Sequence, residues 1–274
     1  MYSQLKLVHR PVDADRSPIV FIHGFPDSPA MFSDYVTGPE LSQSWLIRRN
    51  IYTYSFPNRH DNPNYPCFTE LIAGVIATEF DEHLDSLTKQ SPTGKVAIVA
   101  HDWGATHAWR WIRNQKDAPV ERLVALSVGS SFRYDVYEHG LGAFSWLSGL
   151  WFSLGWYVSC LRLHLTWSLV RFGGYQSPTA AELWRDAYHY WDRLLLIIAF
   201  IPRALMPPIQ SEYLDFNFPV LYIRSPLDRI ASTAAFERRL AERADCRAVF
   251  IKGNHWFPEQ KSAEVLAQLR LFLA

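Results

Sequence analysis

The chain has 274 residues, a length that predicts one domain with an insertion or two folded units. It contains 27 basic and 27 acidic residues, and this balance gives no electrostatic reason to bind nucleic acid or another polyanion. Its three cysteines lie far apart and form no CxxC pair, which is typical of proteins in a reducing compartment. The first 18 residues contain no apolar segment of the signal-peptide type, so we expect a cytoplasmic protein.

The first part of the chain alternates segments that resemble strands with segments that resemble helices. Short apolar, β-branched runs predict the strands, and apolar residues at helical spacing predict the helices. The predicted strands cover residues 4–9, 18–23, 51–55, 96–99 and 122–128, and the predicted helices cover residues 68–87 and 105–113.

This alternation stops over residues 132–212, which are helical in pattern and rich in tryptophan, and it resumes afterwards. Strands are then predicted at 218–224 and 246–252, and helices at 232–244 and 258–273. Strands that alternate with helices predict a mostly parallel sheet with helices on both faces. We therefore expect a core of residues 1–131 and 213–274, with residues 132–212 inserted as a helical cap above the strand ends, where such sheets bind ligands.

Residues 141–161 carry no charged side chain, so a membrane-spanning helix has to be weighed against a cap. Glycine and serine dilute the hydrophobicity of this stretch, and no cluster of lysine and arginine flanks it. We favour two short cap helices over an apolar pocket. A cap that also contacts a membrane surface and a true span stay open as alternatives.

The strand predicted at 96–99 leads into a sharp turn with the pattern Ala100-x-Asp102-x-Gly104, and a helix is predicted to follow. Small residues are required there because a strand that turns directly into a helix brings flanking backbone close together. The pattern matches the nucleophile elbow, with aspartate in the place of serine. An ordinary aspartate at a helix N-terminus is the alternative.

Two further polar side chains follow strands downstream. Asp228 lies four residues after the strand at 218–224, and His255 follows the strand at 246–252. The order nucleophile, acid, histidine is the chain order of triads on α/β-hydrolase folds. Asp228 as a loop or N-cap residue and His255 as a surface histidine are the alternatives. His23, His101 and His107 are interpreted as structural.

The chain resembles the α/β-hydrolase superfamily, in particular its epoxide hydrolase and haloalkane dehalogenase branch. The segments HGFP at 23–26 and AHDWG at 100–104 carry this resemblance, together with Asp228 and His255. It implies an α/β-hydrolase fold with a mostly parallel sheet of seven or eight strands, helices on both faces and an inserted helical cap.

The resemblance also implies a reaction. Asp102 would attack a saturated carbon and form an alkyl-enzyme ester, and His255, oriented by Asp228, would activate water to hydrolyse it. The backbone N–H groups of Phe25 and Trp103 would form the oxyanion hole.

In epoxide hydrolases, cap tyrosines donate a proton to the epoxide oxygen. Here Tyr157 matches the first of them, while Tyr190 is the candidate for the second, with Tyr188 as a competitor. Dehalogenases bind the halide with ring N–H donors. Trp103 fits that role, but Phe25 stands where those enzymes often have asparagine.

The sequence therefore predicts a hydrolase that opens an epoxide of a bulky apolar molecule. Haloalkane dehalogenation at the same site is the first alternative, and a non-catalytic ligand-binding relative is the second. We expect no metal and no cofactor, because neither a metal-ligand spacing nor a nucleotide fingerprint is present. The protein is expected to be a monomer or a homodimer. The aromatic residues expected to contact the substrate are Phe25, Trp103, Trp156, Trp191 and Trp256.

Overall fold

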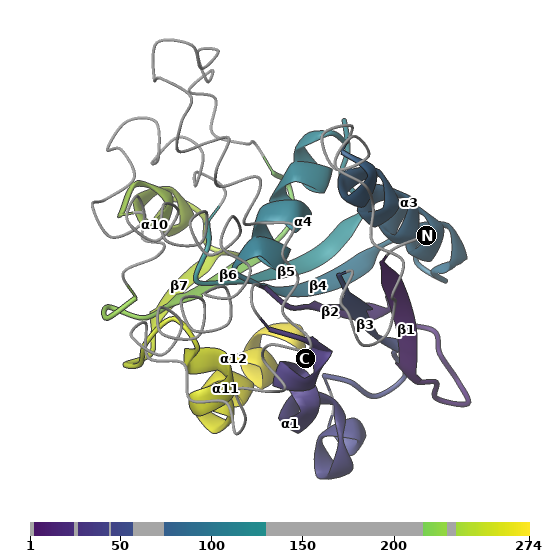
Figure 1. The fold of residues 1–274 in the computed structure, drawn as a ribbon, viewed down its shortest axis with the longest axis horizontal. Helices are drawn as coiled ribbons and strands as arrows, with labels where there is room; N and C mark the ends of the chain where they lie inside the picture. The colour runs from purple at the N-terminus through teal and green to yellow at the C-terminus, as the bar shows by residue number, and fades with distance from the viewer. Residues whose placement is uncertain (1–2, 25–26, 44, 57–73, 130–215, 229–233) are drawn as a thin grey trace, which may run out of the picture.

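The computed structural model describes a sheet with helices on both sides (Figure 1). The residues that it describes are 3–24, 27–43, 45–56, 74–129, 216–228 and 234–274. The predicted cap at 132–212 and its two boundaries lie outside the described residues.

The described residues form a seven-stranded sheet in the order β1-β3-β2-β4-β5-β6-β7. Strand β1 runs antiparallel to β3 at one edge, and every other pair of neighbours is parallel. The strands are β1 Gln4–His9, β2 Ile19–Ile22, β3 Ile51–Ser55, β4 Val96–His101, β5 Val120–Leu126, β6 Val220–Arg224 and β7 Arg247–Phe250.

Helices cover both faces of this sheet. In Figure 1, α3, α4 and α10 lie on one side of it, and α1, α11 and α12 lie on the other. The helices are α1 Ser33–Val36, α3 Val75–Gln90, α4 Trp103–Arg113, α10 Ala234–Ala241, α11 Phe257–Gln260 and α12 Ser262–Leu273, with 3-10 turns η1 Pro29–Phe32 and η2 Gly38–Ser42.

The central strands are apolar along their whole length because both of their faces are covered. In β2, Val20 and Ile22 join the core beneath α3, α4 and α10, whereas Ile19 and Phe21 join the core beneath α1 and α12. All four side chains are fully buried. This is the expected consequence of side chains that alternate between two helix-covered faces.

Several element boundaries near the strand ends differ from the sequence prediction by one to three residues, and two of them have a clear local cause. Helix α4 begins at Trp103, two residues earlier than predicted, because Asp102 alone makes the turn. Strand β5 covers Val120–Leu126 rather than 122–128, since Ser127 adopts a left-handed φ of 70° that ends the extended backbone.

The last predicted helix is interrupted. Residues 258–273 were expected to form one helix, but α11 and α12 are separated at Lys261, whose φ of −125° is not helical. The Lys261 N–H donates to the carbonyl of Phe257, which closes α11 before α12 starts. The short segments η1, α1 and η2 have too few residues for a recognisable period, and the sequence did not predict them.

None of the helices in the described part of the chain is long and apolar enough to cross a membrane. The uncharged stretch 141–161 lies outside that part.

Arg49 is fully buried and links the amino ends of β2, β3 and β5, at the end of the sheet opposite the turn that follows β4. Arg49 donates to Glu121 from both terminal nitrogens, at 3.1 Å and 2.7 Å, and to the Ser17 carbonyl at 2.8 Å. Burial raises the pKa of Glu121, but its hydrogen bonds to Arg49 and Ser17 outweigh this, so the net shift is downward. The pair therefore fixes the residues that precede β2 and β3 against β5.

We predict that Glu121→Gln lowers the free energy of unfolding by about 2–3 kcal/mol, because it leaves the buried Arg49 charge without its carboxylate. Urea denaturation followed by circular dichroism measures this change. The same substitution at the exposed Glu242 is the control and should change stability by less than about 0.5 kcal/mol. Equal effects of the two variants would contradict the prediction.

Candidate active site

The turn between β4 and α4 places Asp102 in a strained backbone conformation. Its φ is 49° and its ψ is −119°, and Arg48 and Ser127 are the other non-glycine residues with a positive φ in the described ranges. Such a conformation costs about 1–3 kcal/mol and persists only where surrounding structure enforces it. Here the Asp102 N–H donates to the Leu126 carbonyl, and the Asp102 carbonyl accepts from Thr106, which holds the turn on both sides.

Two glycines allow the chain to pack closely around Asp102. A Cβ atom at Gly104 would lie 2.5 Å from the carbonyl oxygen of His23 and 2.6 Å from that of Ile22. A Cβ atom at Gly24 would lie 2.5 Å from the Cβ of Asp102. These approaches explain why the pattern needs small residues, and they put the turn after β2 directly beside the Asp102 carboxylate.

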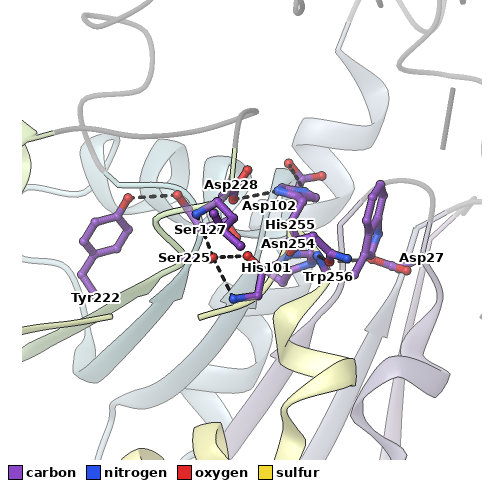
Figure 2. A network of polar contacts seen from close by, with 12 residues as sticks. Asp27, His101, Asp102, Ser127, Tyr222, Ser225, Asp228, Asn254, His255 and Trp256 are labelled. Atoms are coloured by element: carbon purple, nitrogen blue, oxygen red, sulfur yellow. Dashed lines mark hydrogen bonds and ion pairs between the residues drawn. The ribbon is translucent and has the colours of Figure 1, made fainter. Parts of the chain in front are cut away.

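Asp102 is the N-cap residue of α4, but its side chain makes no capping hydrogen bond to that helix. One of its oxygens lies 3.5 Å from Nε2 of His255, and Nδ1 of the same imidazole lies 3.0 Å from Oδ2 of Asp228 (Figure 2). The side chains of the three residues are at most 8% exposed. The structure therefore brings the three predicted triad residues together in a buried cluster.

Each member of this cluster comes from the carboxyl end of a strand. Asp102 follows β4, Asp228 follows β6, and His255 follows β7. Because these strands are parallel, their carboxyl ends meet at one edge of the sheet. Asp228 and His255 lie 126 and 153 positions after Asp102 in the chain, and the order of the strands in the sheet brings the three residues side by side.

The two carboxylates control the protonation of His255. Complete burial would lower the pKa of His255, but the negative charges of Asp228 and Asp102 outweigh it and raise the pKa well above its ordinary value of 6.5. His255 is therefore held as an imidazolium between two anions at neutral pH. The charged histidine stabilises the fold fully below about pH 6.5, and this stabilisation is lost as the pH rises through the raised pKa.

A second histidine supports the first. His101 lies at the end of β4, and its Nε2 donates to the backbone carbonyl of His255 at 3.0 Å. Its Nδ1 lies 3.6 Å from Oδ2 of Asp27, and both side chains are buried. The sequence predicts a structural role for His101 but does not predict a role for Asp27. The only indication of such a role in the sequence is that Asp27 directly follows the HGFP segment.

His23 and His107 are also buried in positions that suit a structural role. His23 donates from Nδ1 to the Gly24 carbonyl at 2.7 Å and accepts from the Phe56 N–H at 3.3 Å. Burial lowers the pKa of His23 to about 4 and that of His107 to about 3, so both are neutral at neutral pH. His23 thereby ties the turn after β2 to the end of β3.

The remaining predicted site residues divide into two groups. Trp103 is half-buried at the first position of α4, and Trp256 is buried with its ring edge-to-face with His255, 5.2 Å between centroids. Their contact with substrate stays a prediction. The others lie outside the described residues, namely Phe25, Trp156, Tyr157, Tyr190 and Trp191.

Sequence comparison identifies the family. A model of the alpha/beta hydrolase family matches residues 19–269, which include all three members of the cluster. The chain belongs to the alpha/beta hydrolase family. The chain is also 31% identical over 106 residues to a Mycobacterium tuberculosis protein named probable oxidoreductase EphD. That match covers 39% of this chain and only 16% of the relative.

Solved structures of the same fold include enzymes with different activities. The chain superimposes on an epoxide hydrolase from Bacillus megaterium with a TM-score of 0.66 and 15% identity, covering 99% of this chain and 96% of that one. It superimposes on the type II thioesterase BorB with a TM-score of 0.57 and 15% identity, covering 98% and 97%. At such identities these likenesses establish the fold alone.

Within the described part of the chain, no three histidine, cysteine, aspartate or glutamate side chains are arranged to hold a metal ion.

We predict that Gly104→Ala lowers the free energy of unfolding of the protein by about 2–3 kcal/mol and displaces Asp102. The added methyl group would collide with the backbone carbonyls of Ile22 and His23. Urea unfolding and NMR titration of His255 measure the two effects. Gly94→Ala is the control, since nothing lies within 4 Å of its added Cβ. It should leave the His255 titration unchanged. A Gly104→Ala protein with the stability and His255 pKa of the wild type would contradict the prediction.

Proposed function

We propose that this hydrolase opens an epoxide of a bulky apolar molecule through an alkyl ester on Asp102. The observation that carries this proposal is the carboxylate at the elbow, 3.5 Å from a histidine that a second carboxylate orients. A serine would need a general base to become nucleophilic, whereas a carboxylate already carries the negative charge. A carboxylate at this position suits displacement at a saturated carbon.

In the first half-reaction, an oxygen of Asp102 attacks one epoxide carbon and forms a C–O bond. The ring C–O bond breaks, and the epoxide oxygen leaves as an alkoxide that takes up a proton. We assign the proton donors to Tyr157 and Tyr190 of the cap, on the basis of the sequence resemblance. The product of this step is a hydroxyalkyl ester of Asp102.

In the second half-reaction, His255 removes a proton from water, and the resulting hydroxide adds to the ester carbonyl carbon. The backbone N–H groups of Phe25 and Trp103 are the proposed donors to the oxyanion. The close approach of Gly24 to Asp102 supports this assignment, because Gly24 directly precedes Phe25 in the chain. Collapse of the intermediate releases the diol and restores the carboxylate.

The electrostatics of the site link the two steps. Before the reaction, Asp102 and Asp228 together raise the pKa of His255, which keeps the imidazole protonated. Esterification removes the charge of Asp102, so the pKa of His255 falls, and the imidazolium gives up its proton, which neutralises the tyrosinate left by the first step. The base required for the second step is thereby produced by the first.

The comparisons support this choice of chemistry without extending to the substrate. Epoxide hydrolases occur repeatedly among the solved structures of similar fold. The oxidoreductase name of the mycobacterial relative describes a protein of which the matched segment is a small part. Haloalkane dehalogenation uses the same ester, and the experiment below separates it by its product.

We predict that His255→Gln still forms the ester but does not hydrolyse it, because only the second step needs a base. Purified protein is mixed with aryl and alkyl epoxides or bromoalkanes in H₂¹⁸O, and intact and peptide masses are followed under single-turnover conditions. The variant should accumulate the substrate adduct on the Asp102 peptide. His9→Gln, the same change at a half-buried histidine on β1, should turn over like the wild type.

The outcomes distinguish the candidate activities. Diol from the wild type and an adduct on Asp102 in the variant support the epoxide route. Bromide release with the same adduct reassigns the protein to dehalogenation. An absence of adduct and turnover in both substrate panels would overturn the proposal in favour of a ligand-binding role.

We predict that Asp102→Asn lowers the pKa of His255, since the neutral amide imitates the uncharged ester. NMR titration of the His255 imidazole measures this shift without any substrate. Asp81→Asn removes a carboxylate that pairs with Arg110 on α4 and is the control. An unchanged His255 pKa in Asp102→Asn would contradict the electrostatic link between the steps.

A further inference from the structure

A buried serine joins the loop that carries Asp228 to the loop that carries His255. Ser225 directly follows β6 and is fully buried. Its hydroxyl donates to the carbonyl oxygen of Gly253 and accepts from the N–H of the same residue at 3.1 Å. It also accepts from the Leu227 N–H at 3.1 Å. One donor and two acceptor positions are all that a hydroxyl has, so its hydrogen-bonding capacity is fully used.

These contacts extend the pairing of β6 with β7 beyond the end of the strands. The last backbone bond between them runs from the Ile251 N–H to the Arg224 carbonyl at 3.0 Å. Just beyond this bond, the Ser225 hydroxyl contacts both backbone groups of Gly253. A side chain therefore continues the contact between the two segments where their backbones separate.

Asp228 and His255 each lie two or three residues after this junction in the chain. Asp228 lies three residues after Ser225, and its N–H donates to the Ser225 carbonyl at 3.1 Å. His255 lies two residues after Gly253, and its own carbonyl accepts from His101. The two loops are therefore linked twice, once by the Ser225 hydroxyl at Gly253 and once by the 3.0 Å contact between Asp228 and His255 (Figure 2).

The histidine loop has little room to compensate if this junction is lost. A Cβ atom at Gly253 would lie 2.7 Å from the Cβ of Phe257, so the loop already packs directly on α11. Without the Ser225 hydroxyl, the half-buried N–H and carbonyl of Gly253 and the N–H of Leu227 would lose their partner. The loop would then be free to shift away from β6 toward solvent, and His255 would move with it.

We propose that Ser225 is a positioning residue that sets the contact between Asp228 and His255 and thereby the rate of ester hydrolysis. The kinetic part of this proposal rests on the proposed function. The geometric part does not, because the His255–Asp228 contact can be measured in the protein without substrate. Attack by Asp102 depends on the elbow and should depend little on Ser225.

The test compares Ser225→Ala, Ser225→Thr and Ser127→Ala with the wild type. Ser225→Thr keeps the hydroxyl. Ser127 is equally buried at the end of β5, and its hydroxyl contacts no hydrogen-bond partner in the described structure, so Ser127→Ala removes a comparable group without breaking a junction. NMR gives the pKa of His255 and the downfield Nδ1–H resonance of the His255–Asp228 hydrogen bond. Single-turnover kinetics with styrene oxide separate ester formation from ester hydrolysis.

We expect Ser225→Ala to lower the pKa of His255, since a looser Asp228 contact removes part of the effect that opposes burial. The Nδ1–H resonance should broaden or move upfield. Ester hydrolysis should slow at least tenfold while ester formation changes less than threefold. Ser225→Thr should restore much of the loss, and Ser127→Ala should behave like the wild type.

Three results would overturn the proposal. The first is an unchanged His255 pKa and Nδ1–H resonance in a folded Ser225→Ala protein, and the second is an equal effect of Ser127→Ala. The third is an equal fall in both kinetic steps. If Ser225→Ala does not fold, Ser225→Cys, which keeps the volume with a weaker donor, takes its place under the same criteria. Failure of the proposed function would appear instead as absence of any ester in the wild type, while the NMR comparison would still test the junction.

Discussion

The site depends on close packing of three backbone segments around one strained residue. Asp102 can hold its positive-φ conformation because Gly104 brings α4 against the end of β2 and Gly24 lies directly against the Asp102 side chain. Backbone bonds from Leu126 and Thr106 hold the same turn. The strain is thus maintained by many small contacts, and the carboxylate is fixed at the sheet edge where the other strand ends converge.

The second constraint is electrostatic. Three ionisable groups share a buried cluster, and the energetic cost of burying two carboxylates is offset because the imidazole between them carries the opposite charge. The same arrangement makes the proton on His255 depend on whether Asp102 is charged. A covalent reaction at one member of the cluster therefore changes the acid–base behaviour of its neighbour without any movement of the chain.

Support for the cluster comes from backbone groups as much as from side chains. The loop that carries His255 is held at Gly253 by Ser225 and at its own carbonyl by His101. At the opposite edge of the sheet, the buried pair of Arg49 and Glu121 fixes the starts of the strands. The sheet is thus joined by polar contacts at both ends, with apolar packing between them.

Local sequence patterns were enough to predict which segments form the strands of the active site, the sharp turn at Asp102 and the three residues of the cluster. This was possible because buried parallel strands and a sharp turn with small residues each leave a local pattern, as at Val96–His101 and Asp102. Three features could be seen only in the tertiary structure. Ser225 bonds to Gly253, and His101 donates to the carbonyl of His255. The last predicted helix is interrupted at Lys261. These features join segments whose separation is set by sheet order and loop paths, and a one-dimensional pattern of polar and apolar residues contains no such distances.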